Sequence, residues 1–221
     1  MVRDIYKDDQ YFKNYLASQE KRIEKFTGIL AQLSETDKIA KCERYLADYY
    51  RDALTASYSA GKSCAEVKQC FMLYYGALEK SGISDYVELI DVLSLMILFE
   101  IQEVDLNKIV INEKYEDALV AILESYINKS EEPLEIKIGD LLYPEFYAPF
   151  YQYLCDKISE KEFVSYIEQE WYSSSKDLFW YDSHKNSENI YVGYWCWLAA
   201  ASMKIKSAFP SSGRYIPLDL I

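Results

Sequence analysis

Apolar residues recur every three or four positions along almost the whole chain, and charged residues lie between them. This spacing puts the apolar side chains on one face of a helix, so it predicts helices and not strands. The first two stripes cover residues 8–30 and 37–60. Ser63 is followed three residues later by Glu66, a capping-box pattern that starts a third helix, which is expected to end near Ser81-Gly82.

The second half of the chain predicts five more helices. Residues 85–101 are apolar on nearly all sides, which is typical of a helix at the centre of a fold. Asn112 is the expected N-cap of the next helix, and residues 128–144 carry the proline and glycine signals of a loop. The remaining helices are predicted over residues 146–158, 160–172 and 191–206.

These elements predict an all-α fold, a single compact bundle of about eight antiparallel helices with an extended C-terminal tail over residues 210–221. The chain is expected to form one unit over residues 1–221, in which two subregions, residues 1–127 and 140–221, pack together. Its 7 glycines and 5 prolines among 221 residues are too few for a fold of many strands and turns.

Negative charge is concentrated in the middle of the chain. The net charge is −12, of which residues 100–140 hold −7 and residues 141–182 hold −5, while the two ends nearly balance. Such a chain repels phosphate backbones and attracts basic proteins, so we expect no direct nucleic-acid binding. The acidic stretch is either a solvated surface or a docking surface for a basic partner. The candidate contact residues are Glu113, Asp117, Glu124, Glu131, Glu132 and Glu135.

Residues with the spacing of a catalytic or metal site are almost absent from the sequence. A single histidine, His184, excludes a site with several histidine ligands, and there is no GxSxG, P-loop or GxGxxG motif. The five cysteines form no CxxC pair and are expected to be reduced, buried thiols. A dyad of His184 with a cysteine, or a carboxylate pair such as Glu168 and Asp182, is the remaining catalytic alternative. We expect no enzyme activity, no metal and no cofactor.

The sequence also predicts where the protein acts. Residues 1–10 are charged and contain no apolar signal segment, and the most apolar run, residues 93–99, is too short to span a bilayer. We therefore expect a cytoplasmic protein without a membrane partner. The oligomeric state, monomer or homodimer, stays open.

Three stretches within the last 42 residues form a distinctive pattern: Trp180–Lys185, Tyr191–Ala201 and Tyr215–Asp219. They resemble the polymorphic-nuclease immunity family (PoNi), in which an aromatic-Asp-x-His element precedes a Y-x-G-Y-W helix and a Y-P-x-D-L-like tail. Arg3-Asp4 and residues 50–61 resemble the N-terminal half of that family, so the resemblance covers nearly the whole chain. The motif residues are Trp180, Tyr181, Asp182, His184, Tyr191, Gly193, Tyr194, Trp195, Pro217 and Asp219.

The resemblance implies an immunity protein that binds a cognate DNase toxin, a basic protein, and occludes its nucleic-acid-binding or active site. Charge complementarity with an acidic inhibitor fits that role. We interpret the motif as architecture: Gly193 permits a close approach, and Tyr194 and Trp195 anchor a core. An adaptor or chaperone for a secreted effector, and an enzyme with an unrecognised carboxylate site, are the alternative functions.

Overall fold

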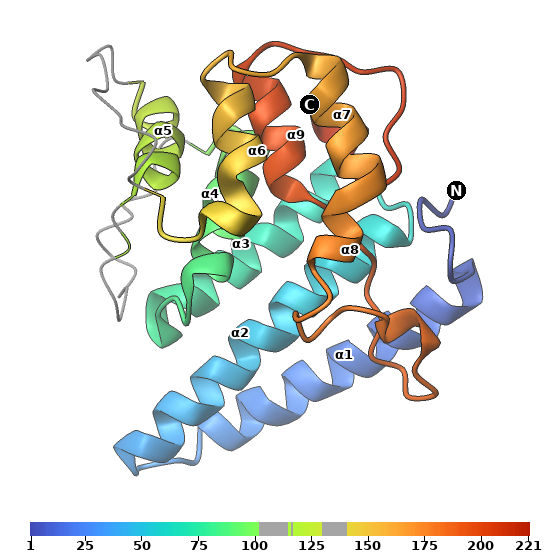
Figure 1. The fold of residues 1–221 in the computed structure, drawn as a ribbon. Coiled ribbons are helices and arrows are strands. Elements are labelled where there is room, and N and C mark those ends of the chain that lie inside the picture. Colours follow the sequence, from blue (N-terminus) through green and yellow to red (C-terminus); the bar gives the residue numbers. More distant parts are fainter. Residues whose placement is uncertain (102–114, 116, 130–140) are drawn as a thin grey trace. The chain divides into compact units, whose positions relative to one another are not determined.

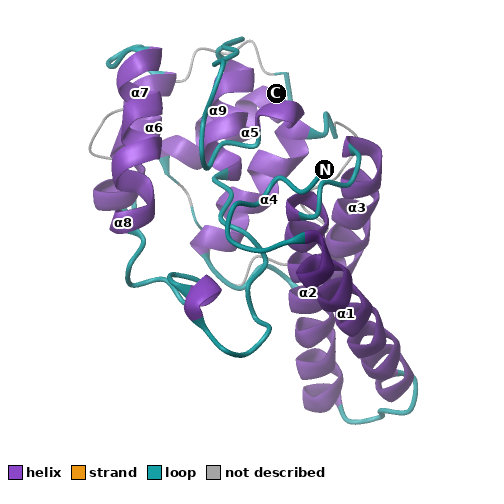
Figure 2. Ribbon diagram, turned by 90° about the vertical axis from the view of Figure 1, so that its right-hand side faces the viewer, coloured by secondary structure: helices purple, strands orange, loops and turns teal. Residues whose placement is uncertain are grey.

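The structure, a computed structural model, describes residues 1–101, 115, 117–129 and 141–221. Every element in these ranges is helical, which confirms the predicted all-α class (Figure 2). The described residues form two compact units. The first comprises residues 1–83 and 182–194, and the second comprises residues 84–101, 115, 117–129, 141–181 and 195–221.

Three long helices build the first unit: α1 (Asp9–Leu30), α2 (Thr36–Ser59) and α3 (Cys64–Ser81). Helix α2 packs against both α1 and α3 (Figure 1). The Ser63–Glu66 capping box at the start of α3 is present as predicted, because each side chain bonds the other residue's backbone N–H. Gly82, with φ of 75°, ends α3 in the left-handed region that glycine adopts without strain.

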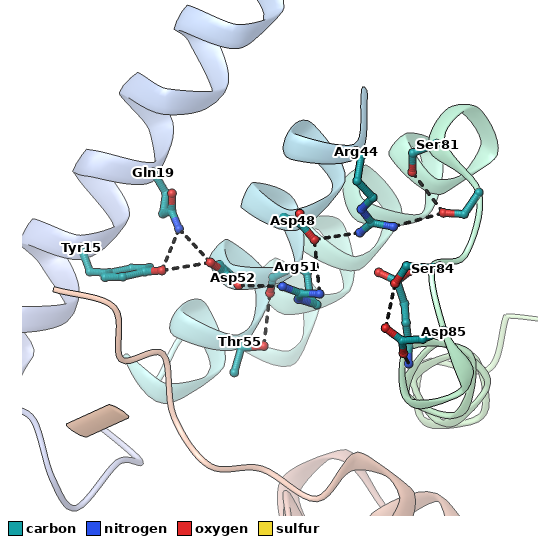
Figure 3. A network of polar contacts seen from close by, with 12 residues as sticks. Tyr15, Gln19, Arg44, Asp48, Arg51, Asp52, Thr55, Ser81, Ser84 and Asp85 are labelled. Atoms are coloured by element: carbon teal, nitrogen blue, oxygen red, sulfur yellow. Dashed lines mark hydrogen bonds and ion pairs between the residues drawn. The ribbon is translucent and has the colours of Figure 1, made fainter. Parts of the chain in front are cut away.

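A polar network lies where α1 meets α2 (Figure 3). The Gln19 amide donates to the Tyr15 hydroxyl at 2.7 Å, and the Tyr15 hydroxyl donates to the Asp52 carboxylate at 3.3 Å. Arg51 lies 3.6 Å from the same carboxylate. Burial is the main cause that raises the pKa of Tyr15, so its hydroxyl stays protonated and remains a donor. The network therefore satisfies the buried Gln19 and fixes the pairing of the two helices.

The second unit contains shorter helices around α4 (Tyr86–Leu98), of which eleven of thirteen residues are buried. This confirms the prediction of a central helix. Helix α4 packs against α9 (Trp197–Ile205) and α5 (Ala118–Ile127). The other helices of this unit are α6 (Pro144–Leu154), α7 (Glu160–Tyr166), the π-helix η3 (Ile167–Trp171), α8 (Tyr172–Ser174) and the 3-10 helix η5 (Leu218–Leu220).

Several predicted helix bounds were wrong. Residues 191–196 are not helical, because Gly193 has φ of 122° and the neighbouring backbone groups bond to other segments; α9 begins only at Trp197. Helix α6 ends at Leu154 and not at the predicted Ile158. Asp156, two residues after the end of the helix, adopts a positive φ of 56°. The predicted N-cap Asn112 lies outside the described residues, and the N-cap of α5 is Asp117.

The predicted C-terminal tail is partly buried. Tyr215, Ile216 and Leu220 have exposed fractions of 5% or less, and the Tyr215 carbonyl accepts a 2.8 Å bond from the Cys196 amide just before α9. The expectation of buried thiols holds for Cys42 and Cys196, whereas Cys64 is exposed. None of the helices in the described part of the chain is long and apolar enough to cross a membrane.

Candidate functional site

In the first unit, the motif segment of residues 182–194 is bonded to the N-terminal residues. The Tyr191 hydroxyl, whose ring is 1% exposed, donates to the Asp4 carboxylate at 2.5 Å. The other oxygen of that carboxylate accepts from the backbone N–H groups of Tyr6 and Lys7 at 2.7 and 2.8 Å. The Tyr11 hydroxyl donates to the Tyr191 carbonyl at 2.9 Å and accepts from the Tyr191 amide. Burial, followed by the Asp4 carboxylate, raises the pKa of Tyr191, which keeps this hydroxyl a donor.

His184 belongs to the same cluster and lies in the 3-10 helix η4 (Ser183–Lys185). Its Nδ1 atom lies 2.8 Å from the Tyr194 hydroxyl, which also accepts from the His184 amide at 3.1 Å. The ring of Tyr6 lies 4.2 Å from the imidazole, centroid to centroid. Burial is the largest cause that lowers the pKa of His184, so the neutral imidazole is favoured. Its described partners are thus aromatic residues of the fold, and none is a cysteine sulfur.

The N-terminal residues make a second set of contacts with the end of α2. The Arg3 guanidinium donates to the carbonyls of Tyr58 and Lys62 at 2.9 and 2.8 Å and lies 4.4 Å from the centre of the Tyr58 ring. The Ser59 hydroxyl donates to the Val192 carbonyl at 2.6 Å. At Gly61 the φ angle is 80°, and an added Cβ would overlap the backbone carbonyl of Met1. Residues of the N-terminal resemblance, Arg3 and Ser59, therefore contact each other's segments and Val192 of the C-terminal motif here.

The motif residues Trp180 and Tyr181 lie in the second unit, within an aromatic cluster. The ring of Trp180 stacks on that of Trp171 at 5.5 Å, and Tyr181 lies 4.7 Å from Tyr172. Tyr172 in turn stacks on the buried Tyr215 at 5.6 Å. Pro217 is buried and Asp219 is exposed, while Trp195 is half-buried. The interpretation of this motif as architecture stays a prediction.

The described part of the chain offers little chemistry. No three residues of the types His, Cys, Asp and Glu lie close enough there to hold a metal ion. Burial raises the pKa values of the Cys42 and Cys196 thiols and disfavours their reactive thiolate forms. The catalytic pair considered above is not assembled within one unit, because Glu168 belongs to the second unit and Asp182 to the first. Asp182 instead pairs with Lys185 at 2.8 Å.

Of the acidic contact candidates, only two are described. Asp117 is 8% exposed and caps α5: one carboxylate oxygen accepts from the amides of Leu119 and Val120 at 3.0 and 2.9 Å. The other accepts from the Tyr86 hydroxyl at 2.6 Å and the Leu142 amide at 3.1 Å. Asp117 is therefore a buried helix cap, and its role as a contact residue stays a prediction. Glu124 is half-buried on α5. The other candidates, Glu113, Glu131, Glu132 and Glu135, lie outside the described residues.

Sequence reasoning missed two features of the structure. The Asp4–Tyr191 bond joins residues 187 positions apart, and no local pattern indicates it. The second feature is Phe179, whose side chain is 81% exposed. No sequence signal marks it, because Phe163 also lies beside acidic residues and is fully buried.

Two protein-family models match the chain, one over its N-terminal half and one over its C-terminal half. Residues 3–111 match the family model described as PoNe immunity protein (PoNi), N-terminal, and residues 115–212 match the model described as PoNe immunity proteins (PoNi), C-terminal. No curated protein and no solved structure matches the chain.

Proposed function

Because the chain belongs to the family of PoNe immunity proteins, we propose that it binds a DNase toxin of the PoNe type and holds it inactive. The proposed site of action is the cytoplasm of the producing cell, where the DNA to be protected lies. The proposed mechanism needs no reaction by the immunity protein. A nuclease must present basic side chains to hold phosphates, and an acidic protein that covers them blocks the substrate.

Beyond the family, a group of exposed carboxylates in the second unit supports this proposal. In the second unit, Glu160, Glu168, Glu170 and Asp177 are exposed and have no ion-pair partner in the described part of the chain. Such groups contribute little to folding but attract a basic partner over about 10 Å at an ionic strength of about 0.1 M, and over about 30 Å at about 0.01 M. Their attraction raises the association rate, and burial at an interface then supplies affinity. Nuclease–immunity pairs of another kind, the colicin DNases, are among the tightest known complexes.

We further propose that the acidic stretch of residues 100–140, with its net charge of −7, contributes to this attraction. Glu124 and Asp117 stay candidate contact residues, and the candidates chosen for charge reversal are Glu113, Glu131, Glu132 and Glu135. The test is charge reversal of each residue to lysine, with association rates measured at two salt concentrations. A rate that falls and a salt dependence that weakens support the placement. Unchanged rates and salt dependence for all four variants would contradict it.

The function itself is tested by co-expression in a bacterial host. The host carries the toxin domain encoded next to this chain, alone or together with the immunity protein, and survival and DNA integrity are scored. We expect survival, intact chromosomal DNA and a complex that co-purifies. A complex that forms while DNA is still degraded would show an adaptor and not an inhibitor. The matched control is a catalytically dead toxin, which must be harmless with or without the immunity protein.

A further inference from the structure

The second unit has a cluster of aromatic side chains where its helices turn into a loop. Trp171 and Tyr172 lie at the junction of η3 and α8, and their rings contact Trp180 and Tyr181. All four residues are half-buried, and Phe179 between them in sequence is 81% exposed. We call Tyr172, Phe179, Trp180 and Tyr181 the aromatic face. Tryptophan and tyrosine are the residues most enriched at the energetic centres of protein interfaces.

Three carboxylates lie close to the aromatic face along the sequence. Glu168 and Glu170 lie on η3, within one turn of Trp171 and Tyr172, and Asp177 precedes Phe179 by two residues. All three are exposed and have no ion-pair partner among the residues that the structure describes. We call them the acidic rim. Nearby basic side chains are Lys176 and Arg214, so the net charge of the face stays negative.

The backbone under the acidic rim is unusual. Residues 167–171 form a π-helix within an otherwise α-helical run from Glu160 to Ser174. Single π-helical turns are rare and occur frequently at functional sites, because they widen the helix and redirect its side chains. Here the π-turn carries both rim glutamates and Trp171. This feature is independent of side-chain composition and points to the same part of the surface.

We propose that the aromatic face and the acidic rim together form the surface that docks on the basic, DNA-binding side of the toxin; this rests on the proposed function. Arginine and lysine side chains of the toxin can stack on Trp180 and Tyr181 while their charges meet the rim carboxylates. The same charge argues against a second copy of this chain as the occupant, because two acidic rims would repel each other. The occupant is therefore a basic protein surface.

The first test truncates the most exposed ring. Phe179→Ala removes a ring that is 81% exposed, so the urea concentration at which the free protein unfolds should change little. We expect its dissociation constant for the purified, catalytically dead toxin domain to rise about tenfold to a hundredfold. Phe209→Ala is the matched control, because Phe209 is also in the second unit and 74% exposed but lies outside the face. Its affinity should be unchanged.

The second test removes the rim charges. A triple variant, Glu168→Gln with Glu170→Gln and Asp177→Asn, keeps the side-chain shapes. We expect a slower association rate and a weaker salt dependence, with a smaller change in dissociation rate. Glu145→Gln, which removes an exposed carboxylate in the first turn of α6, is the control and should change the rate far less.

The outcomes separate this proposal from the function on which it rests. If the unsubstituted protein binds and inhibits the toxin but Phe179→Ala binds as tightly as Phe209→Ala, the aromatic face is not the interface and the proposed function stands. If the unsubstituted protein does not bind the toxin at all, the proposed function fails and this proposal fails with it. A Phe179→Ala variant that changes the oligomeric state of the free protein, measured by light scattering, would overturn the choice of occupant.

Discussion

Asp117 offers the sharpest test of whether an acidic residue supports the fold or contacts a partner. Its carboxylate accepts bonds from the amides of Leu119 and Val120, and it also accepts from the Tyr86 hydroxyl at 2.6 Å. In Asp117→Ala the helix cap disappears, which costs about 1 kcal/mol. The Tyr86 side chain is 2% exposed, and its orphaned hydroxyl adds about 1–3 kcal/mol. We therefore expect a loss of about 2–4 kcal/mol in the free energy of unfolding.

Two further variants calibrate this loss. Asp117→Asn keeps one oxygen that can cap α5 but replaces the other acceptor with an amide donor that faces the Leu142 amide. The free energy of unfolding of Asp117→Asn should lie between those of Asp117→Ala and the unsubstituted protein. Glu124→Gln, on the same helix, removes a half-buried charge and should change the unfolding free energy by less than about 1 kcal/mol.

The assay is urea unfolding followed by tryptophan fluorescence. All 4 tryptophans lie in the second unit, as does Asp117, so the signal reports the affected unit. A midpoint for Asp117→Ala that matches the unsubstituted protein, with an equal m-value, would refute the reasoning. A stable Asp117→Ala protein that no longer binds toxin would instead support the sequence-based prediction that Asp117 is a contact residue.

Three more predictions concern the first unit. Tyr191→Phe leaves the Asp4 carboxylate without its 2.5 Å donor and should cost about 1–3 kcal/mol by urea unfolding followed by circular dichroism, whereas a change below about 0.5 kcal/mol would contradict it. Gly61→Ala forces an L side chain to φ of 80° and should cost at least about 1–2 kcal/mol in thermal or urea unfolding, while Gly28→Ala, whose added Cβ meets nothing within 4 Å, should be neutral or stabilising. The pKa of His184 in the folded protein lies below its ordinary value of 6.5. As the pH falls through 6.5, His184 of the unfolded chain therefore binds a proton more readily than His184 of the folded protein. Stability should therefore decline below pH 6.5 and less steeply in His184→Gln, and equal slopes for the two proteins would contradict this assignment.

The helical periodicity of the sequence predicted the fold class and most helices correctly. Short-range signals were the reliable ones: the Ser63–Glu66 capping box and the apolar residues of α4 depend only on neighbours within a few positions. The predicted helix over residues 191–206 began too early, because its first residues bond to segments far away in sequence. The Ser59–Val192 bond spans 133 positions, and periodicity carries no information on such contacts.

The candidate site was harder to predict than the fold. An aspartate between a charged residue and an apolar helix has the same sequence pattern whether it caps the helix or faces solvent, and Asp117 proved to be the cap. Exposure of a single aromatic residue is equally ambiguous in sequence. Phe179 and Phe163 are both phenylalanines near acidic residues, but Phe163 is fully buried while Phe179 is 81% exposed. Only the tertiary packing separates an exposed phenylalanine from one in the core.

The central claim is that this protein inhibits a DNase by binding and not by catalysis. The most direct measurement titrates the purified protein into a fixed amount of the active toxin domain and follows the cleavage of plasmid DNA. We predict that activity falls linearly, ends at an equimolar ratio, and returns when the complex is dissociated. Loss of activity at a small fraction of the equimolar amount, or full cleavage in the presence of a saturated complex, would contradict the claim.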